Sequence, residues 1–262
     1  MADEVLRGGV ANAGAVVRRG EHVLRPSNPH TGSIHRLLTA LHETGFDGAS
    51  VPVGVDPDGR ERLVFVPGEV AVAPFPDWFQ TDAVLASIAD LMRRFHDAAG
   101  AFDPTGETWS DEMVDPAGGP VVVHNDVCPE NVVFRDGVAV ALLDFDFAAP
   151  GRPVYDLAAM ARMCGPVDDD ASAARLGWGP VDQPARLRLV ADTYGLEADG
   201  RHELVAVLGD TFDRGGEFVL RRVEAGDPNF IQMWVEMGGM ERFDRRRRWW
   251  TEARAAFEVA LA

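Results

Sequence analysis

The sequence predicts an α+β protein of two lobes, a small β-rich N-terminal lobe over residues 1–68 and a larger, mostly helical lobe over residues 69–262. Short apolar runs alternate with turn residues through the first 70 positions, whereas apolar residues beyond position 80 recur at helical spacing. Three prolines within residues 67–80 predict a linker between the two parts. A hydrophobic content of 46% in 262 residues allows a large core.

The N-terminal part is expected to contain two hairpins. Apolar residues at 16–17 and 23–24 flank a first turn, and those at 51–55 and 63–66 flank a second turn rich in Asp, Pro and Gly. Between the hairpins a helix is expected, with Ser33 as its N-cap and its apolar face formed by Ile34, Leu37, Leu38 and Leu41.

The C-terminal part is expected to be mostly helical. Apolar spacing predicts one helix that begins after a cap at Thr81 or Asp82, and three others over residues 184–195, 201–224 and 229–262.

The charge composition excludes several mechanisms. All 25 basic residues are arginine, so the chain has no lysine for a Schiff base or for a P-loop. With 42 acidic residues the net charge is -17, which disfavours nucleic acid and anionic membranes as partners and suits either a soluble surface or a cationic partner. No apolar run is long enough to span a membrane and no signal-peptide pattern is visible, so a cytoplasmic protein is expected. The sequence indicates no oligomeric state.

One segment carries a chemical pattern. Residues 121–123 read as a buried strand that leads into a polar loop, and residues 131–134 and 138–143 read as a hairpin. The hairpin brings Asn131, at its start, next to Asp144, at its end, with Asp126 in the loop beside them. Carboxylate and amide oxygens are ligands that Mg²⁺ uses together with phosphate oxygens, so the pattern indicates phosphoryl transfer.

The order His124-x-Asp126-x-x-x-x-Asn131, followed by Asp144, resembles the catalytic and metal-binding segments of the protein-kinase-like superfamily. Asn125, the run Asp144-Phe-Asp146 and the segment 150–158 are similar to the aminoglycoside phosphotransferase family within it. The motifs that carry this resemblance lie within residues 121–159.

The resemblance implies a role for each residue. Asp126 would be the catalytic base, His124 would support its loop, and Asn131 and Asp144 would hold Mg²⁺. Asp156 would anchor the loop by hydrogen bonding. Asp146 has two candidate roles, a second metal ligand or a contact to the substrate. The phosphoryl donor would be ATP or GTP. The acceptor would be a small-molecule hydroxyl, with a cationic aminoglycoside-like compound as one candidate and choline-like, homoserine-like or sugar acceptors as others.

The sequence departs from that family pattern in the nucleotide-binding part. Arg25 stands where a strand lysine is usual, and the expected helix carries no paired glutamate, although His35 is a substitute to consider. Gly8 and Gly9 belong to a segment expected to cover the phosphates, and Val66 to a hinge expected to bind the base. Arg25 could instead be a surface residue and the glycine segment a plain turn. A kinase-like protein that binds a nucleotide or ligand without catalysis therefore stays as the alternative.

Two further groups have an ordinary structural interpretation. Arg245–Arg248 could suggest phosphate binding, but four consecutive arginines of a helix in an acidic protein are expected to form a solvated, salt-bridged helix. Met233, Trp234 and Met237 are expected to be core residues. If the acceptor is cationic, its carboxylate partners are expected among Glu236, Glu241 and Asp168–Asp170.

Overall fold

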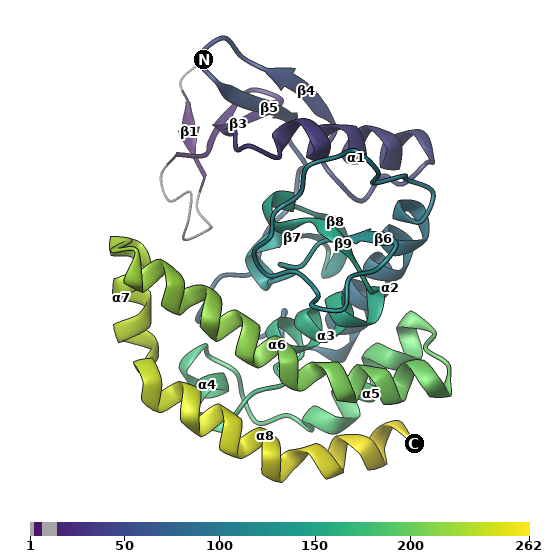
Figure 1. Cartoon of the computed structure of the whole chain (residues 1–262), viewed down its shortest axis with the longest axis vertical. Helices are drawn as coiled ribbons and strands as arrows, with labels where there is room; N and C mark the ends of the chain where they lie inside the picture. The colour runs from purple at the N-terminus through teal and green to yellow at the C-terminus, as the bar shows by residue number, and fades with distance from the viewer. Residues whose placement is uncertain (1–2, 7–14) are drawn as a thin grey trace.

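The structure, a computed structural model, describes residues 3–6 and 15–262 and has two lobes, as expected (Figure 1). The N-terminal lobe is built on an antiparallel sheet with the strand order β1-β2-β3-β5-β4. The strands of this sheet are β1 (Glu4–Val5), β2 (Val17–Arg19), β3 (His22–Pro26), β4 (Pro52–Val55) and β5 (Arg60–Val64). The two predicted hairpins, β2–β3 and β4–β5, are confirmed, and the central pairing of β3 with β5 places Arg25 opposite Glu61.

Helix α1 (Thr31–Glu43) lies between the hairpins in the sequence and buries the predicted apolar face. The expectation that Ser33 caps it is wrong, because the N-cap is His30, three residues earlier, and Ser33 is the third residue of the helix. The Ser33 hydroxyl instead lies within the first turn and donates to Glu107 Oε2 at 2.6 Å. The same hydroxyl oxygen accepts from the Thr108 N–H at 2.9 Å, so Ser33 connects α1 to the C-terminal lobe.

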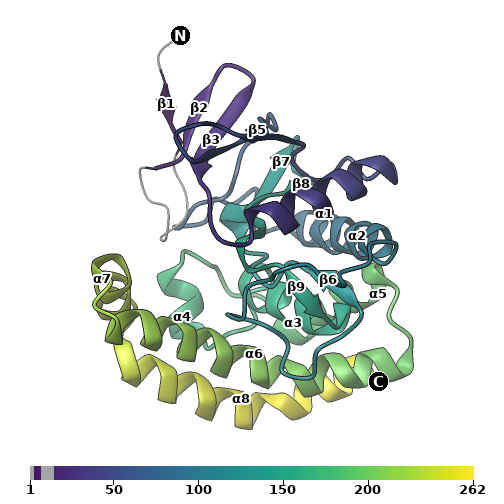
Figure 2. The same ribbon diagram turned by 45° about the horizontal axis from the view of Figure 1, so that its top comes forward.

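The C-terminal lobe places helices around two short β-ribbons, which lie between the N-terminal sheet and the long helices α6 and α8 (Figure 2). One ribbon pairs β6 (Val121–Val123) with β9 (Ala149–Gly151), and the other pairs β7 (Val132–Arg135) with β8 (Val138–Leu142). The helices are α2 (Asp82–Ala99), α3 (Pro153–Cys164), α4 (Asp170–Arg175), α5 (Gln183–Tyr194), α6 (Ala198–Glu224), α7 (Pro228–Met237) and α8 (Gly239–Leu261). None of the helices described has the length and apolar character needed to cross a lipid bilayer.

The predicted helices over 184–195 and 201–224 are confirmed as α5 and α6, and the cap of α2 is Thr81, which accepts from the Val84 N–H at 3.3 Å. The single helix predicted over 229–262 is wrong. Gly238 and Gly239 adopt φ values of 94° and 53°, which no helix continues through, so the chain forms α7 and α8 with a corner between them.

The segment between the lobes has no helix or strand over residues 65–81, as its prolines predicted, but it is not a loose linker. Glu69 and Phe134 exchange two backbone hydrogen bonds, of 3.0 and 2.7 Å, so the segment runs along β7. Phe75 and Phe79 of the same segment are buried in the core. The connection is therefore packed against the C-terminal lobe.

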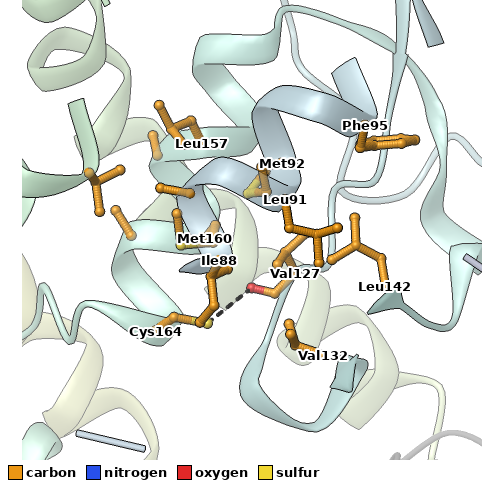
Figure 3. Close-up of a cluster of buried hydrophobic side chains, with 14 of the residues drawn as sticks. Ile88, Leu91, Met92, Phe95, Val127, Val132, Leu142, Leu157, Met160 and Cys164 are labelled. Carbon is orange, nitrogen blue, oxygen red and sulfur yellow. Dashed lines mark hydrogen bonds between the residues drawn. The ribbon is translucent and has the colours of Figure 1, made fainter. Parts of the chain in front are cut away.

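The core of the C-terminal lobe supports the polar loop between β6 and β7 (Figure 3). Val127 in this loop and Val132 at the start of β7 point into a cluster of side chains from α2 and α3, and both are at most 1% exposed. The cluster also contains Ile88, Leu91, Met92, Phe95, Leu142, Leu157, Met160 and Cys164. The Cys164 thiol donates to the Val127 carbonyl at 3.8 Å, so the underside of the loop is held by the core.

Gly68 gives a test of how tightly the connection is packed. Its φ of +151° is unfavourable for other residues, and a Cβ there would lie 2.4 Å from Val133 Cγ1 and 2.6 Å from the Phe134 carbonyl oxygen. We expect Gly68→Ala to destabilise the protein by about 2 kcal/mol or more in urea unfolding. As a control, Gly32→Ala in α1 would place its Cβ against Arg36 Nη1 alone, at 3.7 Å, and should be neutral or stabilising. Equal stabilities of the two variants would contradict the packing described.

Candidate active site

The loop that carries the predicted base is held by Asp156, the buried acid near the start of α3. Asp156 Oδ2 accepts from the His124 N–H at 2.8 Å and pairs with His96 Nε2 at 3.0 Å, while Oδ1 accepts from the Asn125 N–H at 2.8 Å. Burial alone would raise the pKa of Asp156, but these partners bring it below its ordinary value. The carboxylate therefore fixes two consecutive backbone amides directly before Asp126.

His124 is fully buried, and its ring is also part of the support. Its Nε2 lies 2.8 Å from the Leu143 carbonyl oxygen, which can only accept, and its Nδ1 lies 3.3 Å from the Asp126 N–H, which can only donate. These partners assign the neutral tautomer with the proton on Nε2. Burial lowers the pKa of His124, which agrees with a neutral ring that ties the loop to the residue before Asp144.

Asp126 is half-buried beside the amide of Asn131, whose Nδ2 donates to Asp126 Oδ2 at 3.0 Å and to the Asp126 carbonyl at 2.9 Å. Burial and the negative charge of Asp144 raise the pKa of Asp126 to about 8. The structure thus brings together the three side chains, Asp126, Asn131 and Asp144, that the sequence pattern predicted to be neighbours.

The oxygen atoms at this point fit Mg²⁺. Asn131 lies directly before β7 and Asp144 two residues after β8, and the Leu143 N–H donates to the Asn131 carbonyl at 2.8 Å, so the two residues are adjacent. Among the described residues, neither the Asn131 Oδ1 nor the Asp144 Oδ2 receives a hydrogen bond. The same part of the chain holds no group of three His, Cys, Asp or Glu side chains suited to a metal. Mg²⁺ commonly takes one or two ligand oxygens from protein side chains and the remaining ligands from water and phosphate.

Arg25 is a buried residue of the site and not a surface residue. Its Nε donates to Glu61, its Nη1 to Asp144 Oδ1 at 2.6 Å, and its Nη2 to Asp146. Burial lowers the pKa of the guanidinium, but the charges of Asp144, Asp146 and Glu61 raise it more, so the net shift is upward. One arginine therefore joins the sheet to the end of the β7–β8 ribbon.

Glu61 is the acidic partner of Arg25, which the sequence analysis did not find. It lies on strand β5 and not on a helix, is 1% exposed, and binds Arg25 through one oxygen and His35 Nε2 through the other, at 2.8 Å. Sequence reasoning missed it because β3 and β5 are separated by a helix and a strand. The signal available was the single acid of β5, flanked by Arg60 and Arg62, and the register of β3 with β5 places this acid opposite Arg25.

A second carboxylate, Asp146, is also placed at the lobe junction. It accepts from Arg25 and, at 2.8 Å, from Asn28 Nδ2. Burial and the neighbouring Asp144 raise the pKa of Asp146 to about 6. In this structure Asp146 thus joins the two lobes through polar side chains of the N-terminal lobe.

A cavity of about 410 Å³ lies between the lobes above these residues. Arg25, Glu61, Asn131 and Asp144 line its polar end, and Val66 and Gly68 line the connection between the lobes. Its apolar walls include Val23, Ile34, Leu38, Leu63, Phe65, Val133 and Leu142. Such a combination of apolar walls with a charged end suits a nucleotide. Gly8 and Gly9, which were expected to cover the phosphates, lie outside the described residues.

The sequence analysis expected Glu236, Glu241 and Asp168–Asp170 to supply the carboxylates for a cationic acceptor. The structure does not place these side chains at one site. Asp168 and Asp169 are buried, and arginines of α8 neutralise them: Asp168 binds Arg246, and Asp169 binds Arg245 at 2.7 Å. Glu236 and Glu241 are exposed on α7 and α8. The expected salt-bridged helix is therefore present at Arg245–Arg248, but Arg246 is buried in it and not solvated.

Sequence comparison relates this chain to known proteins. A model of the phosphotransferase enzyme family matches residues 106–190, which include the loop and α3. The trifolitoxin immunity protein of Rhizobium leguminosarum bv. trifolii is 36% identical to this chain over 208 residues, which make up 77% of either protein.

Solved structures share the fold at low sequence identity. A choline/ethanolamine kinase family protein from Mesorhizobium loti has a TM-score of 0.67 and 16% identity, over all of this chain and 92% of that one. The GDP complex of aminoglycoside 2'-phosphotransferase-IIIa has a TM-score of 0.59 and 15% identity, over 95% of this chain and 93% of that one. These similarities support the two-lobe kinase-like architecture.

The raised pKa of Asp126 has a consequence for stability. Between pH 4 and pH 8 the folded state keeps a proton that the unfolded chain, with an ordinary pKa of 3.8, releases, so this group lowers stability as the pH rises. We expect Asp126→Asn, measured in EDTA, to raise Tm near pH 8 and to have little effect near pH 4. Asp244→Asn, at an exposed carboxylate of α8, is the control without this trend. A Tm difference independent of pH would contradict the assignment.

Proposed function

This chain belongs to the phosphotransferase enzyme family, and we propose that it moves the γ-phosphoryl group of ATP or GTP to a hydroxyl group of a small molecule. The observation that carries the proposal is the meeting of Asp126, Asn131 and Asp144. Asn131 and Asp144 line the cavity between the lobes together with Arg25, which binds Asp144. Acid, amide and guanidinium groups in this arrangement are what phosphoryl transfer requires.

In the proposed reaction the acceptor oxygen attacks the γ-phosphorus, and the bond from that phosphorus to the oxygen bridging the β- and γ-phosphates breaks. The nucleoside diphosphate leaves with the bonding electron pair, and the hydroxyl proton passes to Asp126. The products are a phosphate monoester and the diphosphate. Asn131, through its hydrogen bond to Oδ2, would orient the carboxylate for this transfer.

The remaining residues of the site would bind and position the donor. Mg²⁺ held by Asn131 and Asp144 would neutralise phosphate oxygens and would offset the Asp144 charge that raises the pKa of Asp126. Arg25, held by Glu61, which His35 also binds, would bind phosphate through its planar donors. His124 and Asp156 would act as positioning residues, since both bind the loop and not the reacting atoms.

The first kinetic prediction concerns the base. We expect Asp126→Asn and Asp144→Asn each to lower kcat by about 10²-fold or more, because the first removes the proton acceptor and the second a charged metal ligand. The measurement is transfer of the γ-phosphoryl group from ATP or GTP, with Mg²⁺, across a panel of aminoglycosides, amino alcohols, hydroxy acids and sugars. Asp244→Asn serves as the matched control. Equal rates for wild type and all three variants would contradict the proposed function.

The second kinetic prediction concerns Glu61. Replacing it by Gln removes the charge that holds Arg25 and His35, so we expect Glu61→Gln to raise the KM for the nucleotide about tenfold with a smaller effect on kcat. Glu43→Gln, at an exposed acid of α1, is the control and should leave the KM unchanged. An unchanged nucleotide KM in Glu61→Gln would contradict the role given to the Arg25–Glu61 pair.

A second candidate function is protection against a toxic compound by binding, without transfer. Two observations favour it: the relative that is 36% identical is named an immunity protein, and Arg25 here binds Asp144, the proposed metal ligand. Binding of Mg²⁺-nucleotide followed by thermal shift, combined with the transfer assay, distinguishes the candidates. A nucleotide-dependent Tm increase without transfer to any acceptor favours binding alone, whereas transfer that depends on Asp126 favours catalysis.

A further inference from the structure

The face of the N-terminal sheet that borders the cavity carries charged side chains in successive rows. Backbone register aligns residues of β1, β2, β3 and β5 in one row, and every member of that row lines the cavity: Glu4, Arg18, Val23 and Leu63. The next row on the same face contains Arg25 and Glu61. It lies about 7 Å farther along the strands, because same-face residues are two positions apart. The cavity is therefore lined by arginines at two positions along the sheet.

The two arginines lie toward different ends of the cavity. Arg25 binds Asp144 and belongs to the end where the phosphates are expected. Arg18 lies toward the segment that connects the lobes: its Cζ is 3.9 Å from the centroid of the Phe65 ring, and Phe65 directly precedes Val66 in that segment. Phe65 and Val66 line the cavity as well. A nucleotide whose phosphates reach Arg25 would therefore place its base near Arg18.

The guanidinium of Arg18 is oriented by its neighbours but keeps donors for a ligand. Its Nε donates to the Gly20 carbonyl at 2.9 Å, and the group stacks on Phe65. Within residues 3–6 and 15–262, neither Nη atom of Arg18 donates a hydrogen bond, and Arg18 forms no salt bridge with Glu4, which lies opposite it in β1. Two neighbouring amino groups of a half-buried arginine are thus available at the cavity wall.

We propose that Arg18 binds the base of the nucleotide and makes this chain prefer a guanine donor over an adenine donor. Guanine presents two neighbouring acceptors, O6 and N7, which match the paired N–H donors of a guanidinium. Adenine presents N7 next to an amino group, whose hydrogens would point at the donors of Arg18. The proposal rests on the proposed phosphotransferase function and specifies its phosphoryl donor as GTP.

Glu4 adds an acceptor to the same row of side chains. The N1–H and the 2-amino group of guanine can both donate to a carboxylate, whereas adenine has only its 6-amino group for this purpose. Arg18 and Glu4 together therefore match more groups of guanine than of adenine. Because Glu4 can accept from either base, the discrimination itself is assigned to Arg18, which adenine would leave facing an amino group.

The test measures the Kd of the full chain for GDP, IDP and ADP by calorimetry, with Mg²⁺ present. IDP keeps O6 and N7 but lacks the 2-amino group, so it separates the contact to Arg18 from a contact of that amino group with Glu4. For wild type we expect GDP to bind about tenfold or more tighter than ADP, and IDP to bind closer to GDP than to ADP. Guanosine and adenosine should keep the same order, because the base contacts do not require phosphates.

The variant Arg18→Met removes the donors and keeps an apolar side chain against Phe65. It should weaken GDP and guanosine about tenfold, with a much smaller effect on ADP and adenosine and with little change in the Tm without ligand. Arg18→Lys should restore only part of the loss, because an ammonium lacks the paired planar donors. Glu4→Gln should keep the preference for IDP over ADP. Arg19→Met is the control for lost charge, since Arg19 is the exposed neighbour on β2 that pairs with Asp3.

Three results would overturn the proposal: wild type binds ADP as tightly as GDP, Arg18→Met weakens both nucleotides by the same factor, or the preference for guanine is lost in Glu4→Gln but kept in Arg18→Met. The second result would assign Arg18 to the phosphates or to packing. Transfer from ATP as efficient as from GTP would overturn the guanine preference alone and leave the proposed function standing. Guanine-selective binding that depends on Arg18, without transfer from GTP to any acceptor, would contradict the proposed function and leave the base site standing.

Discussion

The guanidinium of Arg25 is the interaction on which the two lobes depend. It binds Glu61 in the N-terminal sheet and Asp144 and Asp146 at the end of the β7–β8 ribbon, all in a largely buried position. A buried arginine with three carboxylates gains enough attraction to offset its desolvation, whereas three carboxylates without it would repel one another. One side chain therefore joins the lobes at the cavity, and Asn28 adds a neutral hydrogen bond to Asp146 beside it. Farther from the cavity the Leu142 N–H donates to the Gly48 carbonyl, and Ser33 donates to Glu107, so these contacts also connect the lobes.

The opposite side of the cavity is kept in place by a different kind of interaction. Asp156 binds two backbone amides of the loop, and the neutral ring of His124 joins that loop to Leu143. Below them Val127 and Val132 pack between α2 and α3, so the loop has a polar upper face and an apolar lower face. Such a loop loses little freedom when a ligand arrives, because the fold has already ordered it.

Charged side chains of both signs are buried in this fold. Acidic residues outnumber arginines by 42 to 25 in the whole chain, and among the described residues acids outnumber arginines in the interior as well. The buried arginines are Arg25, Arg186 and Arg246, and the buried acids are Glu61, Asp115, Asp156, Asp168 and Asp169. The planar guanidinium can serve several acceptors at once, as Arg25 does, which a lysine ammonium does less specifically. Arg25 therefore takes the place at which the sequence pattern led us to expect a lysine.

The sequence by itself determined the two-lobe architecture, most helices and strands, and the meeting of Asp126, Asn131 and Asp144. These follow from local patterns, since a hairpin brings its own ends together and a short loop keeps its residues near them. Tertiary structure alone decided the break at Gly238–Gly239, the pairing of Glu61 with Arg25, and the neutralisation of Asp168 and Asp169 by α8. Each of these joins residues distant in the chain or depends on backbone angles. Periodicity reports only which face of an element is apolar, and it does not report which element that face will meet.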